Sequence, residues 1–481
     1  MSDEPKLNER CDVEPGVETP LAPEAVIGKP AGLPNHLPIW RIVLVLSWWP
    51  LLEQIMGALV GFVDTALAGR LDPAATEAIG ASGYVLWLMG MMQGAVGVGA
   101  TAIIARAVGA GRYKEANHAV GQAMMLAIIW GLINTVLFWF AAPLVALVTS
   151  LEGHAAELCV MYLQWLALVA PCRAVLFIGS ACLRGAGDTR SPFFVMLIVN
   201  IINVIVSIAL VADFSPVGGF GLRGVAIGTM VAWIVGMVLM GAMLLKGRGG
   251  VKLLLPEMRF DRAMSGRLVR IGAPALMESG VHWAGNLMVV IIVGSLAGLG
   301  LAERPMGSQI IGIRIEAFSF LLGFAFNIAA STMVGQYLGV NDIASAKKAA
   351  WISWAYGSVI MVGFGLLFML MPGPLVRIFT DQEPFLSAVP PILFHAGWAQ
   401  IGFASYLVLS GALRGAGDTR TTMYITFGCT FLVRLPLAYL IGVHWGYGLT
   451  GVWIALAIEL IVRGSVFMAR FLHGGWTKIK V

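Results

Sequence analysis

Twelve long apolar runs dominate this chain and leave it few ways to fold. From residue 39 onward, the runs are roughly 20 residues or longer and carry few charges. A run of this length crosses the hydrocarbon layer of a membrane as a helix, whereas membrane β-barrels use alternating segments of about ten residues. In lipid the backbone must satisfy its own hydrogen bonds, and a helix does so within one segment. We therefore predict an all-α integral membrane protein with twelve transmembrane helices.

The composition also indicates that lipid is the main solvent. Of the 481 residues, 58% are hydrophobic and 12% are charged, compared with about 25% charged in soluble domains. Five scattered cysteines show no CxxC spacing, so we expect no disulfide framework, no metal site and no cofactor. The predicted spans are residues 42–69, 79–105, 119–148, 156–182, 192–212, 221–245, 268–300, 308–338, 350–379, 385–412, 422–442 and 449–470.

An octapeptide occurs twice and divides the spans into two sets of six. Residues 183–190 read Leu-Arg-Gly-Ala-Gly-Asp-Thr-Arg, and residues 413–420 repeat them without change at an offset of 230. At the same offset Gly109 falls on Gly339, and Ala116 falls on Ala346. Two separate matches at one offset indicate a duplicated half, as in transporters built from paired bundles. We predict a flexible tail (residues 1–38), a six-helix lobe (39–246), a linker (247–265), a second six-helix lobe (266–472) and a short tail (473–481).

The basic residues predict the orientation in the membrane. Nineteen Lys and Arg lie in the even-numbered loops and the C-terminal tail, against four in the odd-numbered loops. The positive-inside rule then places both termini, the linker and both octapeptides in the cytoplasm of a plasma or inner-membrane protein. Topology accounts for the net charge of +5, so we expect no nucleic-acid partner.

The two octapeptides are predicted to have a structural role. Glycine permits their tight turns, and Asp188 and Asp418 are placed to cap the helices that follow. Pro50 and Pro274 lie in the first helix of each lobe and are expected to bend those helices.

Several motifs together resemble the multidrug and toxic compound extrusion family. They are the doubled octapeptide, Val63-Asp64-Thr65 with Gly69, and Val334-Gly335-Gln336 with Leu338-Gly339. The resemblance covers residues from about 40 to 470. It implies two six-helix lobes around a central cavity, and export of small, drug-like, often cationic organic compounds in exchange for H⁺ or Na⁺. We expect a monomer in the lipid bilayer.

Asp64 is the first candidate for cation coupling. A carboxylate within a membrane span is costly and therefore rare unless it has a function. In the resembling family this Asp is the coupling residue. Asn203 and Ser207 lie four residues apart, on one face of a helix. In the DinF-like branch these positions hold an Asn and an Asp bonded to the first Asp, so Ser207 departs from that pattern. Ordinary interhelical hydrogen bonding explains the Asn and Ser equally well.

Glu278 and His282 are the second candidate for cation coupling. They also lie four residues apart, so the two side chains are expected to meet. In the NorM-like branch a Glu lies eight residues after the proline of this helix. Here that position is His282, a residue that titrates near neutrality. The branch, and with it the choice between H⁺ and Na⁺, stays open.

Other polar and aromatic residues suggest a substrate cavity. Met surfaces adapt to varied ligands and Trp stacks on organic cations, although packing explains any single one of them as well. The candidates are Trp87, Met91, Glu316, Phe320 and Gln400. Among the charged residues within spans, Glu459 and Arg463 are spaced for an ion pair within one helix.

Three functions remain to be weighed. The motifs favour a secondary antiporter working by alternating access, with no enzymatic activity. A lipid-linked precursor flippase of the same superfamily would need a basic cavity, which only Arg173, Arg314, Arg434 and Arg463 could supply. A membrane-embedded enzyme would need a cluster of acid, base and nucleophile, and the sequence shows neither this nor an ATP-binding motif.

Overall fold

The computed structural model describes residues 30–34, 36–149, 151–211, 219–479 and 481, which are nearly all helical. Most of the expected N-terminal tail, residues 1–29, lies outside this part. The first lobe contains α1 (Ile39–Ala68), α2 (Pro73–Gly109), α3 (Tyr113–Val148), α4 (Gly153–Leu168), α5 (Ala170–Gly185), α6 (Arg190–Val211) and α7 (Leu222–Lys246). The second lobe contains α8 (Arg262–Gly298), α9 (Pro305–Gly339), α10 (Ile343–Leu370), α11 (Pro372–Arg377), α12 (Glu383–Gly415), α13 (Thr419–Gly428), α14 (Leu435–Tyr439) and α15 (Gly448–His473).

The predicted all-helical membrane fold is confirmed. Over the described residues, eleven helices are long and apolar enough to cross a membrane, and α4 with α5 forms a further span bent by 56°. One of the eleven spans, Thr419–His444, consists of α13, the π-helical turn Cys429–Arg434, α14 and a second π-helical turn, Leu440–His444. Single π turns are frequent at functional sites, and the first of these carries Arg434.

Among the described residues, the span formed by α4 and α5 is sharply broken, and the expected bends at Pro50 and Pro274 stay a prediction. Both α1 and α8 continue through Pro50 and Pro274. The break comes between α4 and α5, where Pro171 follows Ala170. Proline lacks the N–H that would continue the ladder and disfavours helical geometry in the preceding residue.

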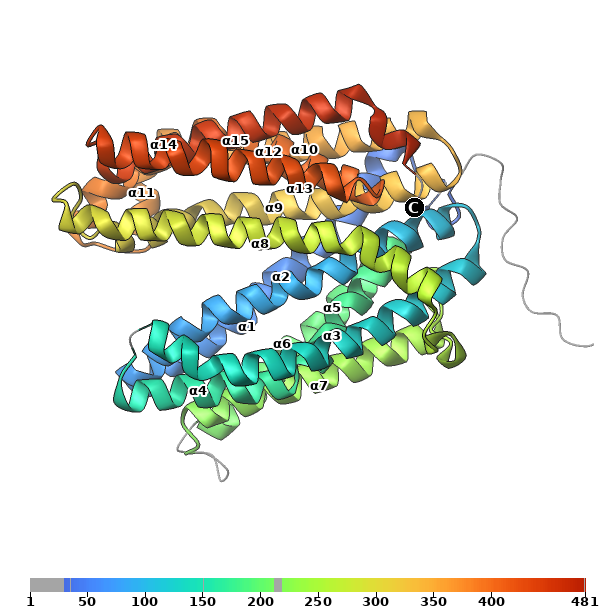
Figure 1. The fold of residues 1–481 in the computed structure, drawn as a ribbon, viewed down its shortest axis with the longest axis horizontal. Helices are drawn as coiled ribbons and strands as arrows, with labels where there is room; N and C mark the ends of the chain where they lie inside the picture. Colours follow the sequence, from blue (N-terminus) through green and yellow to red (C-terminus); the bar gives the residue numbers. More distant parts are fainter. Residues whose placement is uncertain (1–29, 35, 150, 212–218, 480) are drawn as a thin grey trace, which may run out of the picture.

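The two lobes meet at one end of the molecule and diverge toward the other. In Figure 1, α1–α7 and α8–α15 approach each other on the side of the C-terminus. We call this the linker end, because it holds residues 247–261, and the opposite one the far end. There α2 and α8 pack backbone to backbone: a Cβ on Gly99 would lie 2.5 Å from the Leu268 carbonyl oxygen, and one on Gly272 would lie 2.7 Å from that of Ala95. Nearer the far end, a Cβ on Gly83 or Gly280 would meet no atom within 4 Å.

The duplicated halves hold each other symmetrically at the linker end. Gln336 of α9 donates from Nε2 to the Gly185 carbonyl in the first octapeptide, at 3.0 Å. Arg106 of α2, 230 positions earlier, donates from Nη2 to the Ala416 carbonyl in the second octapeptide, at 3.5 Å. The two helices can cross so closely because each has a glycine, Gly109 or Gly339, at the contact.

Segments outside the lobes cover the linker end. Residues 30–34, which we expected in a flexible tail, instead bury Leu33 against the second lobe. Near the C-terminus, the Ile479 carbonyl accepts a hydrogen bond of 2.7 Å from Arg106 of the first lobe. The linker docks on α3, where His118 bonds both Glu257 and Asp261. Both halves of the chain thus contribute to this end.

Candidate functional site

Asp64 lies at the centre of a polar cluster inside the first lobe. Its carboxylate is 4% exposed and accepts from the hydroxyls of Thr229 and Tyr162 at 2.8 and 3.0 Å. Asn203 donates to it from Nδ2 at 3.4 Å and to the Thr229 hydroxyl at 3.0 Å. Four helices, α1, α4, α6 and α7, each supply one member. The carboxylate is therefore surrounded by neutral donors.

Two members of this cluster were missed by the sequence analysis, and one expected member is absent. Tyr162 and Thr229 carry no local signal, because they lie 98 and 165 positions from Asp64. Ser207 lies on the same helix as Asn203, but its hydroxyl has no partner in the described part of the chain. It abuts Gly228 of α7 instead. In this conformation Ser207 makes no hydrogen bond to the Asp64 cluster, and its contribution to cation coupling stays a prediction.

The chemistry open to Asp64 follows from its partners. Among the described residues no Arg, Lys or His forms an ion pair with it. A charge at such depth is expensive unless compensated. A bound proton or a small cation would supply the missing positive charge. The neighbouring hydroxyl and amide groups are compatible with either one.

Glu278 has a different role from the one expected. Its carboxylate accepts from Arg414 at 2.7 Å, from Thr422 at 2.8 Å and from Thr426 at 3.1 Å. Both carboxylate oxygens are therefore engaged. Within the described residues, Glu278 forms no hydrogen bond to His282. Arg414 belongs to the second octapeptide. The Arg of the first octapeptide, Arg184, bonds Glu53 of α1 at 2.7 Å in the same way. The predicted Glu278–His282 pair is wrong, because the octapeptide arginine takes the carboxylate.

His282 faces a charged cluster in the second lobe instead. Glu459 accepts from Arg434 at 2.8 Å and pairs with Arg463 at 2.5 Å, so the expected helix-internal ion pair is confirmed. Arg434 also donates to Asn286, one turn beyond His282 on α8, at 3.0 Å. The Nδ1 atom of His282 is buried and has no partner among the described atoms.

The candidate cavity residues fall into three places. Gln400 of α12 joins Ser319 and Glu316 of α9, at 2.7 and 3.4 Å. Phe320 packs with Phe324 and Phe403 inside the second lobe. Trp87 and Met91 lie on α2, where Trp87 stays 44% exposed. The structure therefore joins Glu316 to Gln400 and separates them from the two α2 residues.

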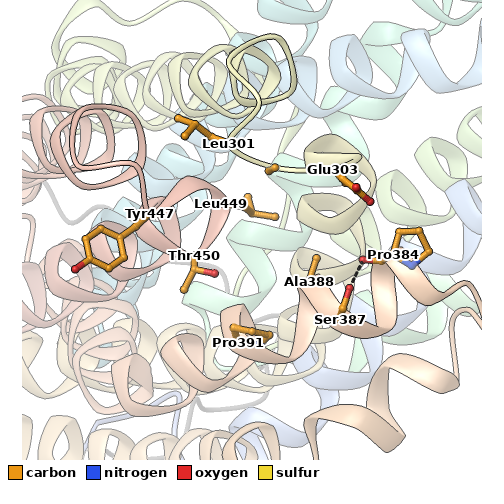
Figure 2. A pocket seen from close by; sticks show the side chains of 10 residues that line it. Leu301, Glu303, Pro384, Ser387, Ala388, Pro391, Tyr447, Leu449 and Thr450 are labelled. Atoms are coloured by element: carbon orange, nitrogen blue, oxygen red, sulfur yellow. Dashed lines mark hydrogen bonds between the residues drawn. The ribbon is translucent and has the colours of Figure 1, made fainter.

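A pocket of about 300 Å³ lies at the far end of the second lobe, away from these clusters. Figure 2 shows its lining, which includes Glu303 from the loop before α9, Ser387 from α12 and Thr450 from α15. None of the predicted site residues lines it. Over the described residues, no group of three His, Cys, Asp or Glu is placed to hold a metal ion.

Comparison with solved structures matches the whole fold. A structure described as MATE in the bent conformation superposes with a TM-score of 0.84 at 20% identity, over 91% of this chain and 96% of that one. A MOP superfamily transporter from Pyrococcus furiosus superposes with a TM-score of 0.83 at 20% identity, over 92% and 97%. These likenesses concern the fold alone.

Comparison of sequences gives the family. The family model described as MatE matches residues 51–209 and 274–440. The chain is 30% identical over 426 residues to a probable multidrug resistance protein NorM of Thermotoga maritima, which covers 89% of this chain and 90% of that protein. It is 25% identical over 432 residues to the multidrug resistance protein PmpM of Pseudomonas aeruginosa, over 87% and 88%. The chain therefore belongs to the MatE family, and it is a multi-pass membrane transporter rather than an enzyme.

Proposed function

We propose that this protein is a secondary antiporter that exports drug-like, often cationic, organic compounds in exchange for H⁺ or Na⁺. The names of relatives such as PmpM support the substrate class. One observation carries the coupling mechanism: Asp64 is buried among three neutral donors, and the described residues supply no counter-charge to it. Binding of the coupling cation supplies the missing positive charge. Release of the cation leaves the buried carboxylate charged and uncompensated again, which is energetically costly. Substrate and cation can therefore alternate at the first lobe.

The proposal includes alternating access between the two lobes. With the linker end in the cytoplasm, the contacts of Gly109 and Gly339 close the inner side, and the lobes diverge toward the outside. This conformation releases substrate outward and receives the coupling cation. Return to the inward-open conformation requires the α2–α9 contact to separate.

The flippase alternative is less well supported. It requires a strongly basic cavity, but Glu459 engages both Arg434 and Arg463. The remaining two arginines do not reproduce such a surface, because Arg314 is exposed on α9 and Arg173 lies in the other lobe.

The test is transport in proteoliposomes with a pH gradient and a Na⁺ gradient imposed separately. We expect gradient-driven movement of rhodamine 123, a cationic dye, to be abolished in Asp64→Asn and slowed about tenfold or more in Thr229→Val, since a hydrogen bond to a charged group contributes about 1.5–3 kcal/mol. Glu77→Gln, which removes an exposed carboxylate of α2 in the same lobe, is the matched control and should transport normally. Unchanged transport by Asp64→Asn would refute the coupling site, and absence of transport under either gradient would refute the antiporter.

A further inference from the structure

Arg173 is a guanidinium within the first lobe that has no acidic partner among the described residues. It lies on α5, one turn after the break at Val169. Its Nη1 donates to the Leu86 carbonyl of α2 at 3.2 Å, and the described residues supply no carboxylate to it. Since a guanidinium offers five N–H donors in a planar fork, most of its capacity is unused. A charge of this kind within a span is by default a functional candidate.

Neighbouring side chains hold the guanidinium in place without neutralising it. Arg173 lies 5.2 Å from the centre of the Phe177 ring and 5.1 Å from that of Trp233. Its Nη2 sits over Gly90 of α2, where a Cβ would lie 3.0 Å away. Cation–π contacts to the faces of the rings leave the edge of the guanidinium, with its N–H groups, available to a ligand.

The face of α5 that carries Arg173 looks across the lobe toward α1. Eleven residues complete just over three turns of a helix, so Arg173 and Arg184 share one face of α5. Arg184 bonds Glu53 of α1, which fixes the direction of that face. Phe177, between the two arginines on this face, keeps 39% of its surface exposed. Arg173 itself is half-buried, so part of its side chain stays accessible.

Asp64 lies at the same depth on the facing helix. On α1, Asp64 lies eleven residues beyond Glu53 in the direction of the far end. The helix α5 runs the opposite way, so Arg173, eleven residues before Arg184, is displaced from Arg184 in the same direction. At 1.5 Å per residue, both groups lie about 16 Å from the Glu53–Arg184 pair. The wall of α7 also connects them, because Thr229 bonds Asp64 and Trp233, one turn later, contacts Arg173.

We propose that Arg173 is a subsite for the carboxylate of a transported compound, so that the first lobe takes organic carboxylates and zwitterions as well as cations. A guanidinium binds a carboxylate through two parallel N–H···O bonds. The amine of a bound zwitterion then lies on the side of the site where Asp64 is held by α7. This proposal rests on the proposed function, since it assigns part of the substrate site of the same transporter.

The experiment compares two dyes that differ by one methyl group. Rhodamine 110 carries a free carboxylate, and rhodamine 123 is its methyl ester. Binding to the purified protein in nanodiscs is followed by fluorescence anisotropy for wild type, Arg173→Gln and Arg173→Lys. We expect Arg173→Gln to weaken binding of rhodamine 110 about tenfold to a hundredfold, the range for loss of hydrogen bonds to a charged group, and to change binding of rhodamine 123 by less than about threefold. Arg173→Lys should retain part of the preference, because it keeps the charge but loses the fork.

Each outcome decides between the subsite and its rivals. Arg223→Gln removes an exposed arginine of α7 and should leave both affinities unchanged. If wild type binds the ester and not the acid, or if Arg173→Gln weakens both dyes equally, Arg173 has only a structural role and the subsite is refuted. If wild type binds neither dye, the multidrug assignment itself fails. Retained binding of rhodamine 123 by Arg173→Gln shows that the variant is folded.

Discussion

Replacing Gly339 by alanine should weaken closure of the linker end. Gly339 ends α9 at its crossing with α2, and a Cβ built there lies 2.3 Å from the Arg106 carbonyl oxygen and 2.9 Å from the Ala110 nitrogen. Both are backbone atoms of the opposite lobe, so no side chain can rotate to make room. A carbon and a carbonyl oxygen normally approach to about 3.3 Å. The two helices must therefore move apart by about 1 Å.

The cost of this displacement applies to one conformation only. Overpacking a close contact by one methyl group costs about 1–3 kcal/mol. The clash disappears when the lobes separate at the linker end, so the cost shifts the equilibrium between the two conformations by a factor of about 5 to 150. Alanine also raises helix propensity, by up to about 1 kcal/mol relative to glycine. Gly363→Ala measures that gain alone, because Gly363 lies in α10 with no atom within 4 Å of an added Cβ.

The assay is double electron–electron resonance between spin labels that replace Lys114 and Lys348, two exposed residues at the linker end, one in each lobe. We expect Gly339→Ala to lower the ratio of the short-distance to the long-distance population at least fivefold, and Gly363→Ala to leave it unchanged. An identical distance distribution in wild type and Gly339→Ala would show that the α2–α9 contact does not set the closed conformation.

Two further predictions concern the octapeptide and the linker. Arg414→Gln leaves the 4%-exposed side chain of Glu278 without its cation and should destabilise the protein by about 3–5 kcal/mol, measured as thermal stability by size-exclusion chromatography. Arg420→Gln, an exposed position of the same motif, should cost less than about 0.5 kcal/mol, and an equal loss in both variants would contradict the role of the pair. The hydrogen bond from His118 lowers the pKa of Asp261, outside the spans. A lowered pKa in the folded state stabilises docking of the linker above the unfolded pKa of about 3.9, and this is lost as the pH falls through the folded value. Pepsin should therefore cleave residues 247–261 only at a pH below about 4, with the midpoint moving upward in His118→Gln; an unchanged midpoint would show that this bond does not hold the linker.

The octapeptide shows where sequence reasoning succeeded and where it stopped. We expected Asp188 and Asp418 to cap the helices that follow. Asp188 does so, accepting from the backbone N–H groups of Arg190 and Ser191 at 3.1 and 3.0 Å. Asp418 instead accepts from Arg470 of α15 at 2.7 Å. Identical motifs thus differ in their contacts, because α7 carries Met240 at the position that Arg470 occupies in α15, 230 residues later.

The same limit applies to the candidate sites. Spacing along a helix indicates which residues share a face, but it does not say which other helix that face meets. Glu278 and His282 do share a face by spacing, yet Arg414 approaches from 136 positions away and takes the carboxylate. Ser207 shares a face with Asn203, yet its side chain lies against the backbone of Gly228 on the adjoining helix α7.

By itself the sequence determined the class of fold, because lipid as solvent admits few backbone solutions, and it determined the two-lobe design, because a duplicated octapeptide at one offset has no simpler origin. It also singled out Asp64, since a carboxylate within an apolar run is costly. Only the tertiary structure decided what surrounds that carboxylate. Tyr162 and Thr229 come from helices 98 and 165 positions away, and hydrogen bonds between distant segments depend on how helices pack, which no local pattern encodes.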